Sequence, residues 1–440
     1  MFTHVTGRTV RFAEYEVDFT RRELRRRGIR IALPKKPFQV LELLLTRPGE
    51  VVTRQELFQF LWPDSHVSYE HSLNSAVNSL RQALGDSSSG EEIISTRPGF
   101  GYLFKAPVHE LEGSARPSRD REKNRDAFED YIKGRYLLDR LVEEDTYKAI
   151  AFFKSAADDA TCSGLAHSGI ADAYSQLASL GWARPSAVAE YARSSAELAL
   201  ANDAGAPEVH ISSARVKMIF DWKWENAEQA ANRALTLDPG SVSANVFQAA
   251  LLCGLGRYTT ASEVCVKALQ LDPLSFPANL QRAACLYTER NYGCAIDQCW
   301  RLLTLAPRFA PAQILMALAY EQVQMREEAY VEFENAHSCL GFEAPAASGM
   351  GRLLATIGRE PETERWRREL SRQAQTRYVS PYLQAVVCLA LGDKTQAFSY
   401  LEESVDERDP TLLGLNADAR FDSVRGDERF QSILAQIGVA

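Results

Sequence analysis

A run of small, polar and uncharged side chains is the feature whose residue types point most directly to a chemistry. His71, Ser75, Asn78, Ser79 and Gln82 recur at spacings of three and four residues. Such spacings place all five on one face of a helix. Asn and Gln pair with adenine in a DNA major groove, and Ser adapts to several base edges. We therefore predict these five residues to be base-facing residues of a recognition helix.

The opposite face of the same helix is apolar. Leu73, Val77, Leu80 and Leu84 follow one another at i, i+4, i+7 and i+11, which predicts a buried stripe on a helix over about 72–84, ending at Gly85. An exposed helix usually fills its outer face with Glu and Lys, whereas this face carries no charge. A plain solvated face is the alternative interpretation.

The segments around this helix predict a small α+β domain. Alternation and turns indicate an antiparallel sheet over 10–12, 15–18, 23–25 and 29–33. A helix should run from Pro34 to about Leu45, and a capping box of Thr53 and Glu56 should open a second helix that ends near residue 62. After the recognition helix, 93–96 and 101–104 read as a hairpin over the turn 97–100.

Residues 8–108 resemble the OmpR/PhoB-type winged-helix domain. The matching residues are Leu33-Pro34, the turn from Pro48 to Arg54, Leu61-Trp62-Pro63, Leu80-Arg81, Ala83-Leu84-Gly85-Asp86, Gly99, Gly101 and Tyr102. The resemblance implies that the third helix enters the major groove while the hairpin, the wing, touches the neighbouring backbone or minor groove. It places Arg81 and Thr96 at phosphate-contacting positions and Ser75 and Ser79 at base-facing ones. We add Asn74, which flanks the polar face, and Arg97 in the wing to the predicted phosphate contacts.

One departure from the family means that the resemblance does not predict which bases this chain prefers. The phosphorylated response regulators of the family usually carry two adjacent Arg where this chain has Asn78 and Ser79. In this respect the chain is similar to the ToxR/CadC-like one-component regulators. Because no receiver domain precedes the predicted winged helix, we do not expect phosphorylation of an aspartate to be the switch.

A second pattern occupies the rest of the chain. Pro239, Pro273 and Pro307 recur every 34 residues, and so do Ala227, Ala261, Ala295 and Ala329. A period of 34 is typical of tetratricopeptide helix pairs. The predicted fold class is mainly α, a small α+β winged-helix domain followed by an α-solenoid of tetratricopeptide-type helix pairs. We predict three parts, a winged helix over 1–109, a polar linker over 110–125 and a solenoid over 126–440 with about eight units, whose tail from residue 412 caps the open end.

The first helices of such pairs form the inner groove of a solenoid, and here the groove positions are mostly apolar. The predicted groove residues are Val246, Ala250, Cys253, Leu280, Ala284, Tyr287, Ile314, Leu318 and Glu321. An apolar groove suits an amphipathic helix or an apolar peptide of a protein partner. The alternative is that some of these side chains pack between neighbouring helices.

Charge and cysteine usage bound the remaining functions. The net charge is −8, but residues 1–110 carry 15 Lys and Arg against 13 Asp and Glu, a balance of +2, so the acidic excess belongs to the repeats. All eight Cys follow residue 161 without a C-x-x-C pair, which favours buried free thiols in a reducing cytoplasm over a redox sensor. The sequence contains no metal-ligand spacing, phosphate-binding loop or catalytic motif, so we predict no cofactor, no metal and no enzyme.

Together these patterns predict a cytoplasmic, one-component, sequence-specific DNA-binding transcriptional regulator. Its partners would be double-stranded DNA and a protein, peptide or effector held by the repeats, with a homodimer on DNA as a further possibility. Neither a signal peptide nor a membrane segment is expected. The alternative is a protein-interaction scaffold whose winged helix has a weak DNA-binding role or none.

Overall fold

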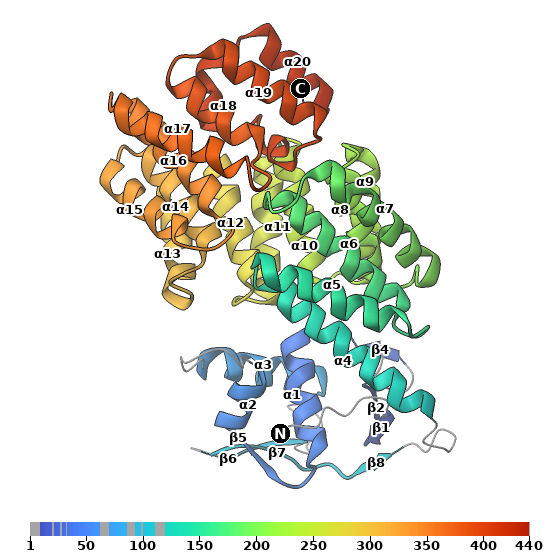
Figure 1. Ribbon diagram of the computed structural model, residues 1–440. Coiled ribbons are helices and arrows are strands. Elements are labelled where there is room, and N and C mark those ends of the chain that lie inside the picture. Colours follow the sequence, from blue (N-terminus) through green and yellow to red (C-terminus); the bar gives the residue numbers. More distant parts are fainter. Residues whose placement is uncertain are drawn as a thin grey trace. The chain divides into compact units, whose positions relative to one another are not determined.

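The structure is a computed structural model that describes residues 9–19, 22–26, 29–31, 33–61, 70–85, 93–97, 100–110 and 119–439. The chain divides into two compact units, Met1–Arg125 and Asp126–Ala440. The first contains both sheets, and the second is built from paired helices (Figure 1). The predicted fold class is confirmed.

Two antiparallel sheets frame the first unit, which we call the head. The larger has the order β4-β3-β2-β1-β8 and the smaller the order β5-β7-β6. Their strands are β1 Thr9–Phe12, β2 Tyr15–Asp18, β3 Glu23–Arg26, β4 Ile29–Ile31, β5 Val51–Thr53, β6 Ile94–Arg97, β7 Gly101–Phe104 and β8 Val108–Glu110. The wing hairpin pairs Thr96 with Tyr102 and Arg97 with Gly101, as its turn predicts.

Three helices, α1 Lys35–Thr46, α2 Arg54–Leu61 and α3 Glu70–Ala83, complete the head. The capping box forms as predicted: the Thr53 amide donates to Glu56 Oε2 at 2.8 Å, and the Glu56 amide donates to Thr53 Oγ1 at 3.2 Å. The amide of Thr53 and the Arg47 guanidinium lower the pKa of the Glu56 carboxyl. This cap fixes the start of α2 directly after β5.

One apolar core joins the sheets to α1 and α3. The rings of Phe12 and Phe104 meet edge to face at 4.9 Å, and the Tyr15 hydroxyl donates to the Leu84 carbonyl at 2.6 Å. The second contact ties the larger sheet to the end of α3. Every member of the predicted stripe on α3 is buried, so the orientation of this helix is set by the core.

Two strands of the head differ from the sequence prediction. Residues 51–53, expected to be part of a turn, form β5, which pairs with β7. Residues 108–110 form β8, which pairs with β1 and adds a strand to the larger sheet. Both strands are three residues long, too short to produce a visible alternation of apolar and polar residues.

The second unit, which we call the body, contains eight helix pairs in its described part. This agrees with the predicted number of about eight. The first helices are α4 Arg119–Asp139, α6 Ser163–Ser179, α8 Pro207–Ile219, α10 Val242–Gly254, α12 Phe276–Thr288, α14 Ala310–Gln322, α16 Glu343–Thr356 and α18 Pro381–Ala390. The second helices are α5 Glu143–Ala157, α7 Pro185–Asn202, α9 Trp224–Leu237, α11 Tyr258–Leu271, α13 Tyr292–Leu305, α15 Arg326–His337, α17 Glu360–Gln373 and α19 Lys394–Asp406. Since α4 begins at Arg119, the end of the predicted linker is helical.

The 34-residue period is visible in the backbone. The second helices from α9 to α19 begin at residues 224, 258, 292, 326, 360 and 394. Two residues before each of these starts, the backbone adopts a positive φ, at Trp222, Gly256, Arg290, Gln324, Gly358 and Gly392. In these six pairs the turn therefore has a left-handed backbone conformation at the same position, whether or not the residue there is glycine.

Small residues allow the helices of the body to approach closely. Ala227, Ala261, Ala295 and Ala329 are fully buried, as the repeat predicts. Phe153 of α5 fills the space between two glycines, because a Cβ at either Gly134 or Gly169 would lie 2.6 Å from its ring. Substitution of these positions by larger residues would force the helices apart.

The C-terminal segment, predicted to cap the open end of the solenoid, packs against the last helix pair and also contacts earlier helices. The C-terminal segment comprises η1 Pro410–Gly414, η2 Ala419–Val424 and α20 Glu428–Ile437. Its η1 contacts α6 and α10, far back along the chain, and its apolar side chains enter the same core as those of α8, α9 and α10. The segment therefore joins the last helix pair, α18 and α19, to α6 and α10.

Within the described residues, no helix is both long enough and apolar enough to cross a bilayer.

Candidate nucleic-acid interface

The two faces of α3 differ as the sequence predicts. Ser75, Asn78 and Gln82 are exposed and Ser79 is partly exposed, while Leu73 and Leu80 on the other side are fully buried. Because the core fixes the apolar face, the polar face has one orientation on the surface of the head. The backbone of His71 belongs to α3, but its side chain lies outside the described residues.

Asn74, at the edge of this face, is held by two neighbours. Its Oδ1 accepts hydrogen bonds from the Tyr102 hydroxyl at 2.8 Å and from the Arg54 guanidinium at 3.1 Å. The Arg54 guanidinium also lies 5.3 Å from the centre of the Tyr102 ring. A residue from α2 and one from the wing strand β7 thus meet on α3, which fixes α3 relative to the wing.

Arg81 links α3 to the other strand of the wing. Its Nη2 donates to the Ile94 carbonyl and to Thr96 Oγ1, both at 2.8 Å. These contacts give Arg81 and Thr96 a positioning role inside the head. Contact of either residue with phosphate stays a prediction, as it does for Arg97, which is exposed at the end of β6.

Sequence reasoning missed two kinds of residue in this region. Arg54 and Tyr102 entered only as parts of the family resemblance, although they hold Asn74 in place. Phe100 is 72% exposed at the wing turn, an unusual position for a large apolar side chain. Its place between two glycines was the available signal. Trp62, Pro63, Asp86 and Gly99, which carry part of the resemblance, lie outside the described residues.

In the body, the predicted groove residues are less accessible than an open groove requires. Tyr287 is buried. Further predicted positions are only partly exposed: Val246, Ala250, Leu280, Ala284, Ile314 and Leu318. Ile314 and Leu318 pack against a core cluster that includes Phe333 and Met350. Partner binding at these positions stays a prediction.

The C-terminal segment contacts the first helices α6 and α10, and its Asp418 and Arg420 act on Tyr287, one of the predicted groove residues. The Trp224 indole donates to the Ile437 carbonyl at 2.7 Å, and the Arg290 guanidinium binds both carboxylate oxygens of Asp422 at 2.7 and 2.8 Å. Tyr382 of α18 donates to Asp418, whose carboxylate also pairs with Arg420. The desolvated Asp418 carboxyl keeps a lowered pKa because Arg420 lies beside it.

A buried carboxylate shared by two arginines lies further toward the start of the body. Asp172 of α6 is 5% exposed and pairs with Arg135 of α4, at 2.8 Å, and with Arg215 of α8. Arg215 also stacks over the ring of Phe247 in α10, 5.8 Å from its centre. Four consecutive first helices are thereby connected through one charge network, which the 34-residue pattern does not reveal.

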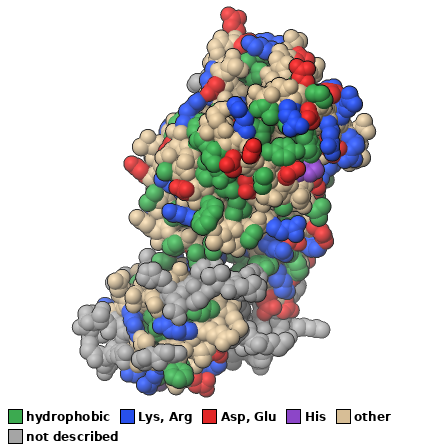
Figure 2. Space-filling model, turned by 90° about the vertical axis from the view of Figure 1, so that its left-hand side faces the viewer, with side chains coloured by type: hydrophobic (Ala, Val, Ile, Leu, Met, Phe, Trp, Pro, Cys, Tyr) green, Lys and Arg blue, Asp and Glu red, His purple; other side chains and the backbone are tan. Residues whose placement is uncertain are grey.

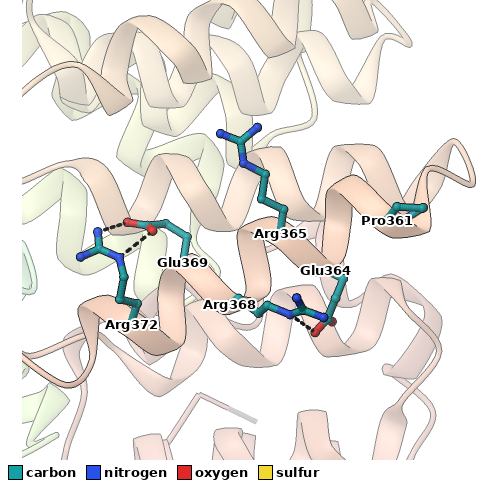
Figure 3. A pocket seen from close by; sticks show the side chains of 6 residues that line it. All are labelled: Pro361, Glu364, Arg365, Arg368, Glu369 and Arg372. Carbon is teal, nitrogen blue, oxygen red and sulfur yellow. Dashed lines mark hydrogen bonds and ion pairs between the residues drawn. The ribbon is translucent and has the colours of Figure 1, made fainter.

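A shallow depression of about 460 Å³ lies along α17 (Figure 3). Glu364 pairs with Arg367 and Arg368, and Glu369 pairs with Arg372, while Arg365 points away from Arg368. The ion pairs lower the pKa of both glutamates to about 2. Because α17 as a whole carries four Glu and four Arg, and most of those lining the depression are engaged in ion pairs, we assign the depression no binding role. On the face seen in Figure 2, acidic and basic side chains are likewise interspersed.

Comparison with known proteins assigns the head to the same kind of domain as its sequence pattern. Residues 28–104 match the family described as "Transcriptional regulatory protein, C terminal". The chain carries an OmpR/PhoB-type winged-helix DNA-binding domain, followed by a solenoid of tetratricopeptide-type helix pairs.

Among curated relatives, the chain is 31% identical over 110 residues to "Transcriptional activator protein IrlR" of Burkholderia pseudomallei, covering 25% of this chain and 45% of that protein. The chain spans less than half the length of the curated relatives that it matches first. Among solved structures, the DNA-binding domain of E. coli CadC is 27% identical, with a TM-score of 0.22, covering 24% of this chain and all of that one. A structure of Pseudomonas aeruginosa PilF is 18% identical, with a TM-score of 0.36, covering 48% of this chain and 94% of that one.

Proposed function

We propose that this protein is a one-component, sequence-specific transcriptional regulator that reads DNA with the polar face of α3. The observation that carries the proposal is that Ser75, Asn78 and Gln82 project from a helix whose other face is locked into the core. Amide side chains on a helix that the core holds in one orientation can form bidentate contacts with adenine. The family to which residues 28–104 match supports the same assignment.

The wing supports binding by presenting an adjacent contact surface. Arg97 is exposed at the end of β6, and Arg81 and Thr96 fix this strand to α3. A positively charged side chain on a strand that is fixed to α3 suits phosphate contact. Such contacts position a protein on DNA without reading its sequence. We therefore assign α3 to sequence recognition and the wing to positioning.

Selection of binding sites from a random duplex pool by the full-length chain tests the proposal. We expect one enriched sequence, and we expect Asn78→Ala to change the preferred base at a single position, at a cost of about 1–3 kcal/mol. Gln59→Ala is the matched control, because Gln59 is an exposed amide on α2 outside this face. If Asn78→Ala weakens binding equally for every sequence, α3 does not read bases through this residue.

A folded chain that binds no duplex at low salt would instead support the scaffold alternative. Phosphate contacts release counterions, so a DNA-binding head must bind more tightly as the salt concentration falls. Measuring the mass of the complex on one selected site also shows whether one or two chains bind, which tests the predicted homodimer.

For the body, we propose that a protein partner or effector binds near α12 and α14. Leu280, Ala284, Ile314 and Leu318 are partly exposed apolar positions on these two first helices. An apolar surface between neighbouring first helices suits one face of an amphipathic helix. Replacing Leu280 by Asp should then abolish partner binding while leaving the fold intact.

A further inference from the structure

Three cysteines that are distant in sequence meet in the middle of the body. Cys253 lies in the last turn of α10, Cys265 lies in α11 and Cys285 lies in α12. The sulfur of Cys285 is 3.3 Å from that of Cys253 and 3.4 Å from that of Cys265. Both distances are within hydrogen-bonding range for thiols, so Cys285 is the centre of a thiol trio.

The three thiols differ in their access to solvent. Cys265 and Cys285 are fully buried, whereas Cys253 is partly exposed. Cys253 also lies 3.8 Å from the Thr288 hydroxyl, at the edge of its apolar cluster. A small solute therefore reaches the trio at Cys253.

Hydrogen bonding within the trio favours one thiolate at its centre. The hydrogen bonds from Cys253, Cys265 and Gln281, together with the charge of Arg282, lower the pKa of the Cys285 thiol. The same contacts with Cys285 and the burial of the sulfur atoms raise the pKa of the Cys253 and Cys265 thiols. The reactive form of a cysteine is its thiolate, and a neighbouring thiol can resolve an oxidised sulfur.

We propose that Cys253 and Cys285 are a redox-active thiol pair that hydrogen peroxide converts to a disulfide joining α10 to α12. Of the two neighbours of Cys285, Cys253 has the shorter sulfur distance and is the one in contact with solvent. The disulfide would form where α10 meets the C-terminal segment, because a Cβ at Gly254 would lie 3.6 Å from the Leu413 carbonyl oxygen.

The reaction balances with peroxide as the only oxidant. The accessible Cys253 sulfur, after losing its proton to solvent, attacks one peroxide oxygen, the O–O bond breaks, and the products are a Cys253 sulfenic acid and hydroxide. The Cys285 thiolate then attacks the Cys253 sulfur at 3.3 Å, an S–S bond forms, and the S–O bond breaks. The hydroxyl group leaves as water after taking the proton that Cys285 released. In total, two thiols and one hydrogen peroxide give one disulfide and two waters.

Peptide mapping distinguishes the possible products because trypsin separates the three cysteines. Cleavage after Arg257, Lys267, Arg282 and Arg290 places Cys253, Cys265 and Cys285 on three different peptides. The full-length reduced chain is treated with hydrogen peroxide, the peroxide is removed, and the chain is unfolded in the presence of iodoacetamide and digested without reductant. We expect the Cys253 and Cys285 peptides to be joined and the Cys265 peptide to be alkylated.

Two variants and one condition sharpen the result. Cys285→Ser should abolish the crosslink, whereas Cys294→Ser should retain it, because Cys294 is an exposed cysteine on a separate peptide. Oxidation of the chain in urea should lose the preference for this pair. A Cys265–Cys285 crosslink, or three fully alkylated peptides after peroxide treatment of the folded chain, would overturn the proposal.

Discussion

The contact between Trp224 and α20 gives the sharpest test of how the C-terminal segment is attached. Trp224 is 6% exposed, and its indole donates to the Ile437 carbonyl at 2.7 Å. The ring also fills space beside two glycines, since a Cβ at Gly254 would lie 2.6 Å from it and one at Gly438 would lie 3.2 Å from it. Trp224→Phe should remove the hydrogen bond and part of this packing.

The expected loss of stability follows from these two contributions. Leaving the Ile437 carbonyl buried without its donor costs about 1–3 kcal/mol. The missing part of the ring costs about 1 kcal/mol more, comparable to the loss of one or two buried methylene groups. We therefore expect the free energy of unfolding to fall by about 2–4 kcal/mol.

Urea unfolding of the full-length chain measures this change, with Trp300→Phe as the matched control. Trp300 is 62% exposed on α13, so its replacement should change stability by less than about 0.5 kcal/mol. Hydrogen exchange of α20 amides should accelerate in the Trp224 variant. A loss below about 1 kcal/mol with unchanged exchange in α20 would refute the role that we give to this contact.

Three further predictions test the head, the repeats and the turns. Arg81→Ala should weaken binding to every DNA sequence and accelerate hydrogen exchange in β6. If Arg81 contacts phosphate, the slope of log affinity against log salt concentration should fall by about one unit. An unchanged slope would mean that Arg81 only positions the wing. Ala295→Leu should overpack a fully buried helix seam and lower the free energy of unfolding by about 1–3 kcal/mol, measured by thermal unfolding. Leu280→Asp should lower it less if Leu280 faces a groove. Equal losses would place Leu280 in the core. Gln324→Gly should gain about 0.5–1 kcal/mol because φ is +63° there, whereas Gln270→Gly in α11 should lose about 1 kcal/mol; a loss at both positions would contradict the strain argument.

The repeats were predictable because their packing depends on residue size. A helix seam accepts only small side chains, so the alanines at 261, 295 and 329 appear in the sequence at the period of the structure. The same reasoning does not extend to the turns. Trp222, Arg290 and Gln324 occupy the left-handed position that glycine fills elsewhere in the series, so the sequence conceals a conformation that the backbone repeats. The surrounding helix pair evidently determines φ at these residues.

In the head, the sequence predicted the faces of α3 but not its connections. A stripe of apolar residues along a helix predicts which side is buried, and in α3 all residues of the predicted stripe are buried. The hydrogen bonds of Asn74 and Arg81 join residues 13 to 28 positions apart, across β-strands whose register no local pattern specifies. Residues that resemble DNA contacts in a helical projection thus also hold the wing against the helix.

The C-terminal segment changes what an inner groove means for this body. An apolar stripe on the first helices predicts that something covers it, but the stripe is the same whether the cover is a partner or a segment of the same chain. Here η1 reaches α6 and α10, and the Arg290–Asp422 pair fixes η2 close to the turn between α12 and α13. The chain's own C-terminal segment therefore contacts helices that carry part of the predicted groove. The partner hypothesis is then confined to surface that the segment leaves partly exposed, and Leu280 on α12 is the position at which one substitution separates a partner surface from core.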